Sequence, residues 1–186
     1  LPVVIRLAGE AAYGTYVLAL TIVSLLFGLL STGVPYRYQR NLISANTYAE
    51  RRALFEPQFT FQVIVVTFLA ALSLVLTPRL ELALSGPAYF TPLLLVALLA
   101  CRLINRQTID YFQFSQRFFA SSLSVAIGPY LFVTALLLLG WRGKQLSLND
   151  LLLTQSATTL IICLPLLIRL VSEIGMPRLH LPWATF

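Results

Sequence analysis

The stretch AGEAAYGTYVLALTIVSLLFGLLSTG, residues 8–33, places a short polar segment with two glycines before a long run that carries no charge. The run continues to residue 36, and VPYRYQR then brings the first basic residues. A helix rises about 1.5 Å per residue, so a run of this length can cross the roughly 30 Å of hydrocarbon in a bilayer. A buried core helix has the same pattern, and the rest of the chain has to distinguish the two.

The composition favours a membrane protein. Hydrophobic residues make up 58% of the 186 residues and charged residues 11%, against roughly 45–50% and about 25% in ordinary globular domains. Further uncharged runs lie at 57–78, 82–101, 118–141 and 151–168. Five such runs between short charged connectors predict an all-α polytopic membrane protein. The expected spans are part of one at 1–5, and complete ones at 12–35, 57–78, 87–106, 118–141 and 150–170.

The basic residues predict the orientation of these spans. Nine of the thirteen lie in one alternate set of connectors and four in the other. Cytoplasmic connectors carry the excess of Lys and Arg, so segments 36–56, 102–117 and 172–186 are expected to be cytoplasmic. In the third complete span, the helix is expected to continue past the lipid as an amphipathic stretch that pairs Arg106 with Asp110. No charge is expected deep inside any complete span.

Several functional classes are disfavoured. The net charge of +6 is explained by topology, and no aromatic and basic platform accompanies it, so no nucleic-acid partner is expected. Cys101 and Cys163 lie in separate apolar runs and are expected to behave as small hydrophobes. The chain has no HExxH, Walker or GxSxG motif, and we expect no cofactor, no metal and no enzymatic activity.

The opening segment resembles a known family. Gly9, Glu10, Tyr13, Gly14 and Tyr16 match a Gly-acidic-x-x-Tyr-Gly-x-Tyr turn, and the helix that follows ends at a glycine shortly before an aromatic–Arg pair. The connector AERRALFEPQF comes next, as a cytoplasmic loop. This arrangement is similar to the first spans of polysaccharide flippases, such as the O-antigen flippase, in the multidrug/oligosaccharidyl-lipid/polysaccharide exporter superfamily. Specific matches cover residues 6–59.

The resemblance implies one six-helix lobe of a two-lobed transporter in the bacterial inner membrane. Residues 1–171 would form most of the N-terminal lobe, and 172–186 would begin the segment between lobes, so the chain is expected to be a fragment. Such a protein flips an undecaprenyl-pyrophosphate-linked oligosaccharide to the outer leaflet by alternating access, for polysaccharide or lipopolysaccharide biosynthesis. Its partners would be this substrate, membrane lipids and other membrane proteins of polysaccharide assembly.

The expected substrate indicates which residues bind it. Arg binds phosphate oxygens bidentately and stays protonated, so the candidates are Arg37 with Arg40 and Arg102 with Arg106. Arg37 is the residue that the resemblance carries over, and both pairs are expected on the cytoplasmic side. Alternatively, these arginines form a solvated stripe, which topology alone explains. Neutral polar residues that could line the route or join helices are Gln62, Gln155, Thr158 and Thr159.

Two other functions stay open. A multidrug or cation antiporter of the same superfamily needs an acidic residue within the membrane, and none is expected inside a complete span. A membrane-embedded glycan polymerase or lipid-sugar transferase exposes catalytic groups on its outer loops, where this chain has only scattered acids.

Overall fold

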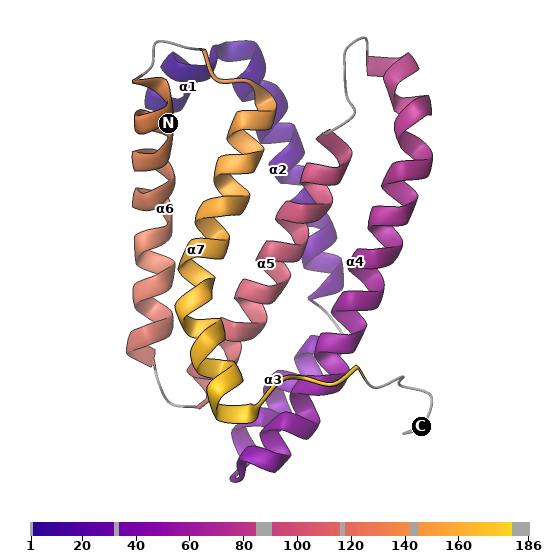
Figure 1. Cartoon of the computed structure of the whole chain (residues 1–186), viewed down its shortest axis with the longest axis vertical. Helices are drawn as coiled ribbons and strands as arrows, with labels where there is room; N and C mark the ends of the chain where they lie inside the picture. The colour runs from indigo at the N-terminus through magenta and orange to yellow at the C-terminus, as the bar shows by residue number, and fades with distance from the viewer. Residues whose placement is uncertain (1, 32–33, 85–90, 116–117, 142–144, 180–186) are drawn as a thin grey trace.

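The computed structural model describes residues 2–31, 34–84, 91–115, 118–141 and 145–179, and these residues form seven α-helices and no strand (Figure 1). The helices are α1 (Pro2–Ala8), α2 (Glu10–Leu30), α3 (Val34–Ser44), α4 (Tyr48–Leu84), α5 (Thr91–Phe114), α6 (Phe118–Gly140) and α7 (Leu148–Ile174).

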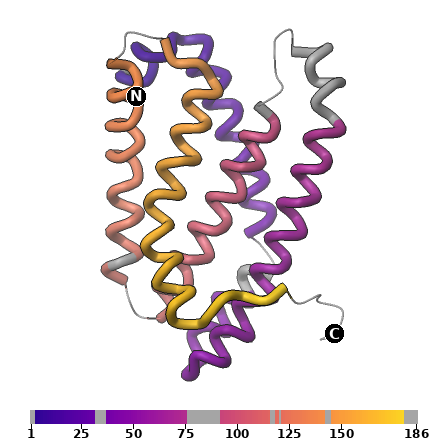
Figure 2. The backbone as a smooth tube through the Cα atoms, viewed as in Figure 1, coloured from indigo at the N-terminus to yellow at the C-terminus, as the bar shows by residue number. Residues whose placement is uncertain are grey.

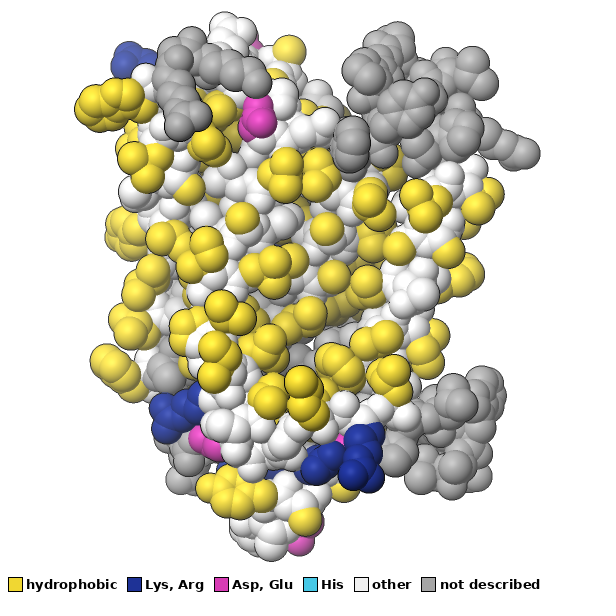
Figure 3. All heavy atoms as spheres, in the orientation of Figure 1, with side chains coloured by type: hydrophobic (Ala, Val, Ile, Leu, Met, Phe, Trp, Pro, Cys, Tyr) yellow, Lys and Arg dark blue, Asp and Glu magenta, His cyan; other side chains and the backbone are white. Residues whose placement is uncertain are grey.

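Five of the described helices, α2, α4, α5, α6 and α7, are long and apolar enough to cross a membrane. Hydrophobic side chains cover the middle of the face seen in Figure 3, and Lys and Arg gather toward its ends. Large hydrophobic side chains of these helices, such as Leu18, Phe68, Leu138 and Ile161, are exposed. Soluble monomers rarely expose so extended an apolar surface, but lipid tails solvate it well. The chain is therefore an all-α polytopic membrane protein, as the sequence predicts.

Helix α5 is the centre of the bundle, where it packs against α7, α4, α2, α3 and α6. Helix α1 lies at the upper end and contacts α2 and α6, while α3 lies at the lower end against α4 and α5 (Figure 1). The chain leaves α7 at the lower end and runs toward α4 (Figure 2). The most basic connectors are thus gathered at the end that carries α3.

Two apolar clusters hold the bundle together. The upper cluster joins α1, α2, α5, α6 and α7 around Val23, Leu98 and Leu151. The lower cluster joins α3, α4, α5 and α7 around Tyr111 and Phe112. Because lipid replaces water outside the bundle, these contacts stabilise the fold mainly through close packing.

A glycine makes the sharp corner between α1 and α2. Gly9 has φ +81° and ψ 161°, a region of backbone conformation that only glycine adopts readily. Its N–H donates to the carbonyl of Ile5, and its own carbonyl accepts from the N–H of Tyr13. The corner therefore ends one helix and begins the next without an intervening loop.

Several helix bounds differ from the predicted spans. Helix α2 ends at Leu30 and a separate amphipathic helix, α3, follows, where the sequence predicts one span over 12–35. The connector AERRALFEPQF is helical and not a loop, because α4 begins at Tyr48. The Glu50 carboxylate accepts from the Thr47 N–H, and the Thr47 hydroxyl accepts from the Glu50 N–H. This reciprocal cap starts α4, so Pro57, predicted to stand near the start of a span, lies inside the helix.

Helix α5 runs from Thr91 to Phe114, so it begins four residues after the start of the expected span, 87–106. It continues past residue 106, and the predicted pair of Arg106 with Asp110 is confirmed. Arg102 is consequently the twelfth of its 24 residues. The expectation that no complete span carries a charge deep inside it stays a prediction, because the helix bounds do not fix where the membrane lies. The later spans agree closely: α6 and α7 lie within four residues of the predicted 118–141 and 150–170.

Candidate functional site

A partly open cavity of about 540 Å³ lies among α2, α5, α6 and α7, and Val4 of α1 completes its wall. Every other lining residue belongs to one of the five candidate spans. The volume falls within the roughly 300–1,000 Å³ that is usual for small-molecule sites. We call this space the upper cavity.

The upper cavity is amphiphilic. Apolar side chains such as Leu20, Phe132 and Ile162 form much of its wall. The polar lining residues are Tyr13, Tyr16, Arg102, Asn105, Ser124, Gln155, Thr158 and Thr159. A cavity of this kind suits a ligand that has both a polar head and an apolar part.

Hydrogen bonds fix part of this polar lining. The Tyr16 hydroxyl donates to Oε1 of Gln155 at 3.1 Å and so joins α2 to α7. The hydroxyls of Thr158 and Thr159 donate to carbonyls of their own helix, at 2.8 and 2.7 Å. By contrast, Oδ1 of Asn105 is buried and has no hydrogen-bond partner among the described residues. It is therefore free to accept a hydrogen bond from a ligand.

Arg102 supplies the positive charge of the upper cavity. Its Nη1 donates to the Ser24 hydroxyl of α2 at 3.1 Å. None of the ion pairs found in the described part of the chain involves Arg102, and no Asp or Glu lines the cavity. An ionised group within a membrane is expensive unless water or an opposite charge compensates it. The cavity thus presents an uncompensated cation to whatever enters.

The other three predicted arginines do not join Arg102. Arg37 and Arg40 are exposed on α3 at the lower end. Arg106 pairs with Asp110, with 2.9 Å between Nε and Oδ1, and does not line the upper cavity. Arg102 and Arg106 therefore lie in different environments, since only Arg102 lines the upper cavity. Their joint role at the cytoplasmic side stays a prediction.

Among the predicted polar residues, Gln155, Thr158 and Thr159 line the upper cavity, and Gln62 does not. Asn105 and Ser124 also line the upper cavity and are not among the residues predicted from the sequence. The available signal was Arg102 with Asn105 three residues later, since this spacing puts both side chains on one helix face.

A proline inside α6 also lies at the upper cavity. Pro129 is inside the helix and lines the cavity next to Gly128. Proline has no N–H, so the carbonyl of Val125, four residues earlier, receives no helical hydrogen bond from it. Val125 is part of the same wall. The local break in the hydrogen-bond ladder therefore falls where a ligand would contact α6.

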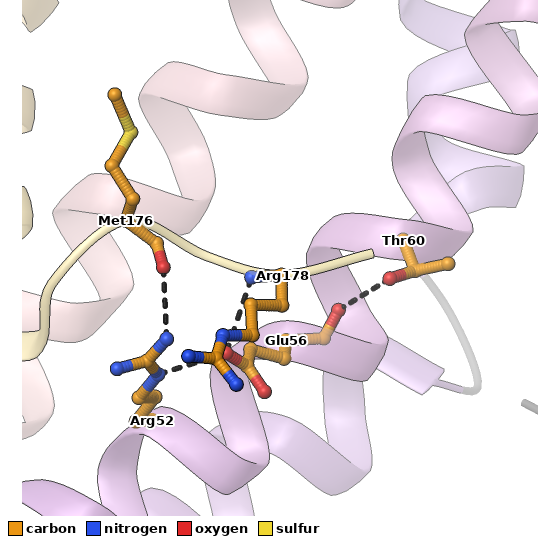
Figure 4. A network of polar contacts seen from close by, with 5 residues as sticks. All are labelled: Arg52, Glu56, Thr60, Met176 and Arg178. Atoms are coloured by element: carbon orange, nitrogen blue, oxygen red, sulfur yellow. Dashed lines mark hydrogen bonds and ion pairs between the residues drawn. The ribbon is translucent and has the colours of Figure 1, made fainter. Parts of the chain in front are cut away.

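A polar network ties the segment after α7 to α4 at the lower end (Figure 4). The buried Glu56 carboxylate accepts from Nε of Arg52 at 2.8 Å and from the backbone N–H of Arg178 at 3.1 Å. Nη2 of Arg52 donates to the carbonyl of Met176 at 3.0 Å. The start of the predicted inter-lobe segment is thereby held against the bundle.

The upper cavity is the part of the structure best suited to bind a ligand. It combines an uncompensated guanidinium, a free amide oxygen and an apolar wall within the membrane-spanning helices. Comparisons of the chain with protein-family models, curated proteins and solved structures found no match.

Proposed function

We propose that this chain is a transporter lobe that carries a lipid-linked oligosaccharide from the inner to the outer leaflet of a bacterial plasma membrane. The observation that supports this most strongly is Arg102, an uncompensated guanidinium in a polar cavity halfway along a central membrane helix. The resemblance of residues 6–59 to polysaccharide flippases points the same way.

The chemistry of the substrate fits the lining of the cavity. A pyrophosphate group cannot cross bare hydrocarbon, because even one charge at the bilayer centre costs about 3 kcal/mol or more. Arg102 would offset this cost by binding phosphate oxygens through its planar fork. Asn105 and Tyr13 offer hydrogen bonds for sugar hydroxyls, and the apolar wall accommodates the first isoprene units.

The lower end is suited to attract such a substrate. Arg37 and Arg40 are exposed on α3, and the basic connectors predict that this end faces the cytoplasm. Exposed guanidinium groups there would concentrate an anionic headgroup near the inner leaflet. In this mechanism, α3 attracts the substrate electrostatically and Arg102 binds it within the bundle.

A cation antiporter of the same superfamily is a second candidate. The observation in its favour is Asp110, a buried carboxylate inside a candidate membrane span. Acidic residues within membrane helices commonly take part in proton or ion movement. This carboxylate does not line the upper cavity. A transporter that binds a lipid-linked sugar in the upper cavity would therefore be compatible with a coupling ion at Asp110.

Substitution of Arg102 tests the proposal in the full-length protein. We expect Arg102→Gln to lower export of the surface glycan at least tenfold at equal protein level. Arg102→Lys should retain part of the export, because lysine keeps the positive charge but cannot bind two phosphate oxygens at once as the planar guanidinium does. Arg6→Gln is the matched control, since Arg6 is an exposed arginine of α1 outside the cavity. Full export by Arg102→Gln would overturn the proposed role of the upper cavity.

A further inference from the structure

A second and much smaller space lies at the lower end of the bundle, where α2, α3, α4 and α5 meet. We call it the lower crevice. Its volume is about 10 Å³, enough for one particle the size of a water molecule. The polar residues that line it are Tyr38, Gln58, Gln62, Arg106, Gln107 and Asp110. None of its lining residues also lines the upper cavity.

Three oxygen atoms around the lower crevice are buried and unpaired. They are Oη of Tyr38 and the Oε1 atoms of Gln58 and Gln62, none of which has a hydrogen-bond partner among the described residues. Each of the three side chains is more than nine-tenths buried. Burial raises the pKa of the Tyr38 hydroxyl well above its usual value, and the nearby Asp110 adds to the effect, so the hydroxyl stays neutral. Folded proteins rarely leave such groups unsatisfied without a bound partner.

A carboxylate completes the lining. Asp110 is buried, and its Oδ2 accepts a hydrogen bond from Nε2 of Gln39 at 2.6 Å. Its Oδ1 lies 2.9 Å from Nε of Arg106. The two side chains differ strongly in exposure, with 52% for Arg106 and 4% for Asp110. The carboxylate is therefore fixed inside the bundle, whereas the guanidinium stands at the rim and can turn toward lipid headgroups.

We propose that the lower crevice is a binding site for a small monovalent cation, Na⁺, which competes with the Arg106 guanidinium for the Asp110 carboxylate. In this site Tyr38, Gln58 and Gln62 supply neutral oxygen ligands and Asp110 supplies the negative charge. Without the cation, Arg106 neutralises the carboxylate. With the cation bound, Arg106 turns outward.

Size and charge favour Na⁺ over other occupants. Oxygen donors are the ligands of hard cations, and sites for divalent ions usually supply more carboxylate charge. The described residues contain no group of three or more His, Cys, Asp or Glu side chains that could hold a metal ion. Gln107, whose Nε2 is also unpaired, presents a further oxygen when its amide rotates by 180°. A water molecule fits the same volume, and stabilisation by Na⁺ but not by choline distinguishes the two occupants.

The position of the crevice gives cation binding a structural consequence. Its ligands come from α3, α4 and α5, and its wall includes Ser31 at the end of α2. The crevice therefore lies where helices from four parts of the chain meet. An ion bound here would hold α3 against α4 and α5.

Na⁺ titration of the purified full-length protein in detergent tests the site. The probe is NaCl, with choline chloride added to keep the ionic strength constant, and the readouts are the thermal unfolding midpoint and binding of radioactive ²²Na⁺. We expect the midpoint to rise with Na⁺ in the wild type, since a ligand that binds only the folded state stabilises it. Asp110→Asn should abolish the rise, and Tyr38→Phe, which keeps the ring packing, should weaken Na⁺ binding at least threefold.

Arg106→Gln gives the sharpest result. Removing the competing guanidinium should lower the thermal unfolding midpoint measured in the absence of Na⁺. It should also strengthen Na⁺ binding about tenfold or more. Arg169→Gln is the matched control, because Arg169 forms a similar i,i+4 pair with Glu173 at the same end and is 54% exposed. It should leave Na⁺ binding unchanged. Equal responses to NaCl and choline chloride in the wild type would overturn the site, as would unchanged Na⁺ affinity in Arg106→Gln. Stronger competition by Ca²⁺ than by Na⁺ would overturn the assignment of the ion.

Discussion

Two glycines in the opening segment should respond to the same substitution with opposite signs. Gly9 makes the corner between α1 and α2 at φ +81° and ψ 161°, whereas Gly14 lies inside α2. An added Cβ would meet no atom within 4 Å at either position. Alanine substitution therefore changes backbone energetics at both sites without a steric clash.

The magnitudes follow from the two backbone conformations. A non-glycine residue in the conformation of Gly9 is strained by about 1–3 kcal/mol. The less flexible unfolded chain offsets about 0.4–1 kcal/mol of this, so Gly9→Ala should lower the free energy of unfolding by about 1–2 kcal/mol. Gly14→Ala should raise it by about 0.5–1 kcal/mol, because alanine is the better helix former.

The assay is equilibrium unfolding of both variants in mixed micelles, followed by circular dichroism at equal protein concentration. The two variants should differ by about 1.5–3 kcal/mol in their free energies of unfolding, which sums the two opposite effects. Equal stability of Gly9→Ala and the wild type would refute the corner geometry. A loss of stability in Gly14→Ala would refute the helical assignment at that position.

Three further experiments test the packing and the polar contacts. Glu56→Ala should release the segment that follows α7 and speed its amide exchange roughly ten- to hundredfold, because hydrogen bonds to charged groups contribute about 1.5–3 kcal/mol. A double-mutant cycle of Tyr16→Phe and Gln155→Leu should give a coupling free energy of about 0.6 kcal/mol, the average for hydrogen bonds between membrane helices; zero coupling would contradict the 3.1 Å contact. Leu151→Ala should cost about 2–5 kcal/mol of unfolding free energy, since Leu151 is fully buried. Leu160→Ala should cost less than about 1 kcal/mol, because Leu160 is 47% exposed on the lipid side, and equal losses in both would contradict this orientation of α7.

The sequence predicts the spans well where charges flank them closely. The run 118–141 corresponds to α6 at Phe118–Gly140 because basic residues stand on both sides of it. In α5 the uncharged run 82–101 ends at Arg102, but the helix continues to Phe114 and pairs Arg106 with Asp110, as the amphipathic pattern of this stretch predicts.

The sites depend on contacts that no local pattern contains. Arg102 contacts Ser24 of α2, 78 residues away, and Tyr16 contacts Gln155, 139 residues away. One-dimensional spacing places Arg102 and Arg106 on one face of an isolated helix, but the neighbours of α5 separate them into different environments. Helix α4 begins at Tyr48 and not at the predicted 57, because Thr47 and Glu50 form a reciprocal cap there.

The most direct test of the central claim is the affinity of the purified protein for an undecaprenyl-pyrophosphate-linked saccharide. Binding to the wild type and to Arg102→Gln should be measured in the same detergent, with Arg6→Gln as the control. If Arg102 binds the pyrophosphate in the upper cavity, the affinity of Arg102→Gln falls at least tenfold and that of Arg6→Gln is unchanged. Equal affinity of all three proteins would contradict the assignment of the upper cavity as the substrate site.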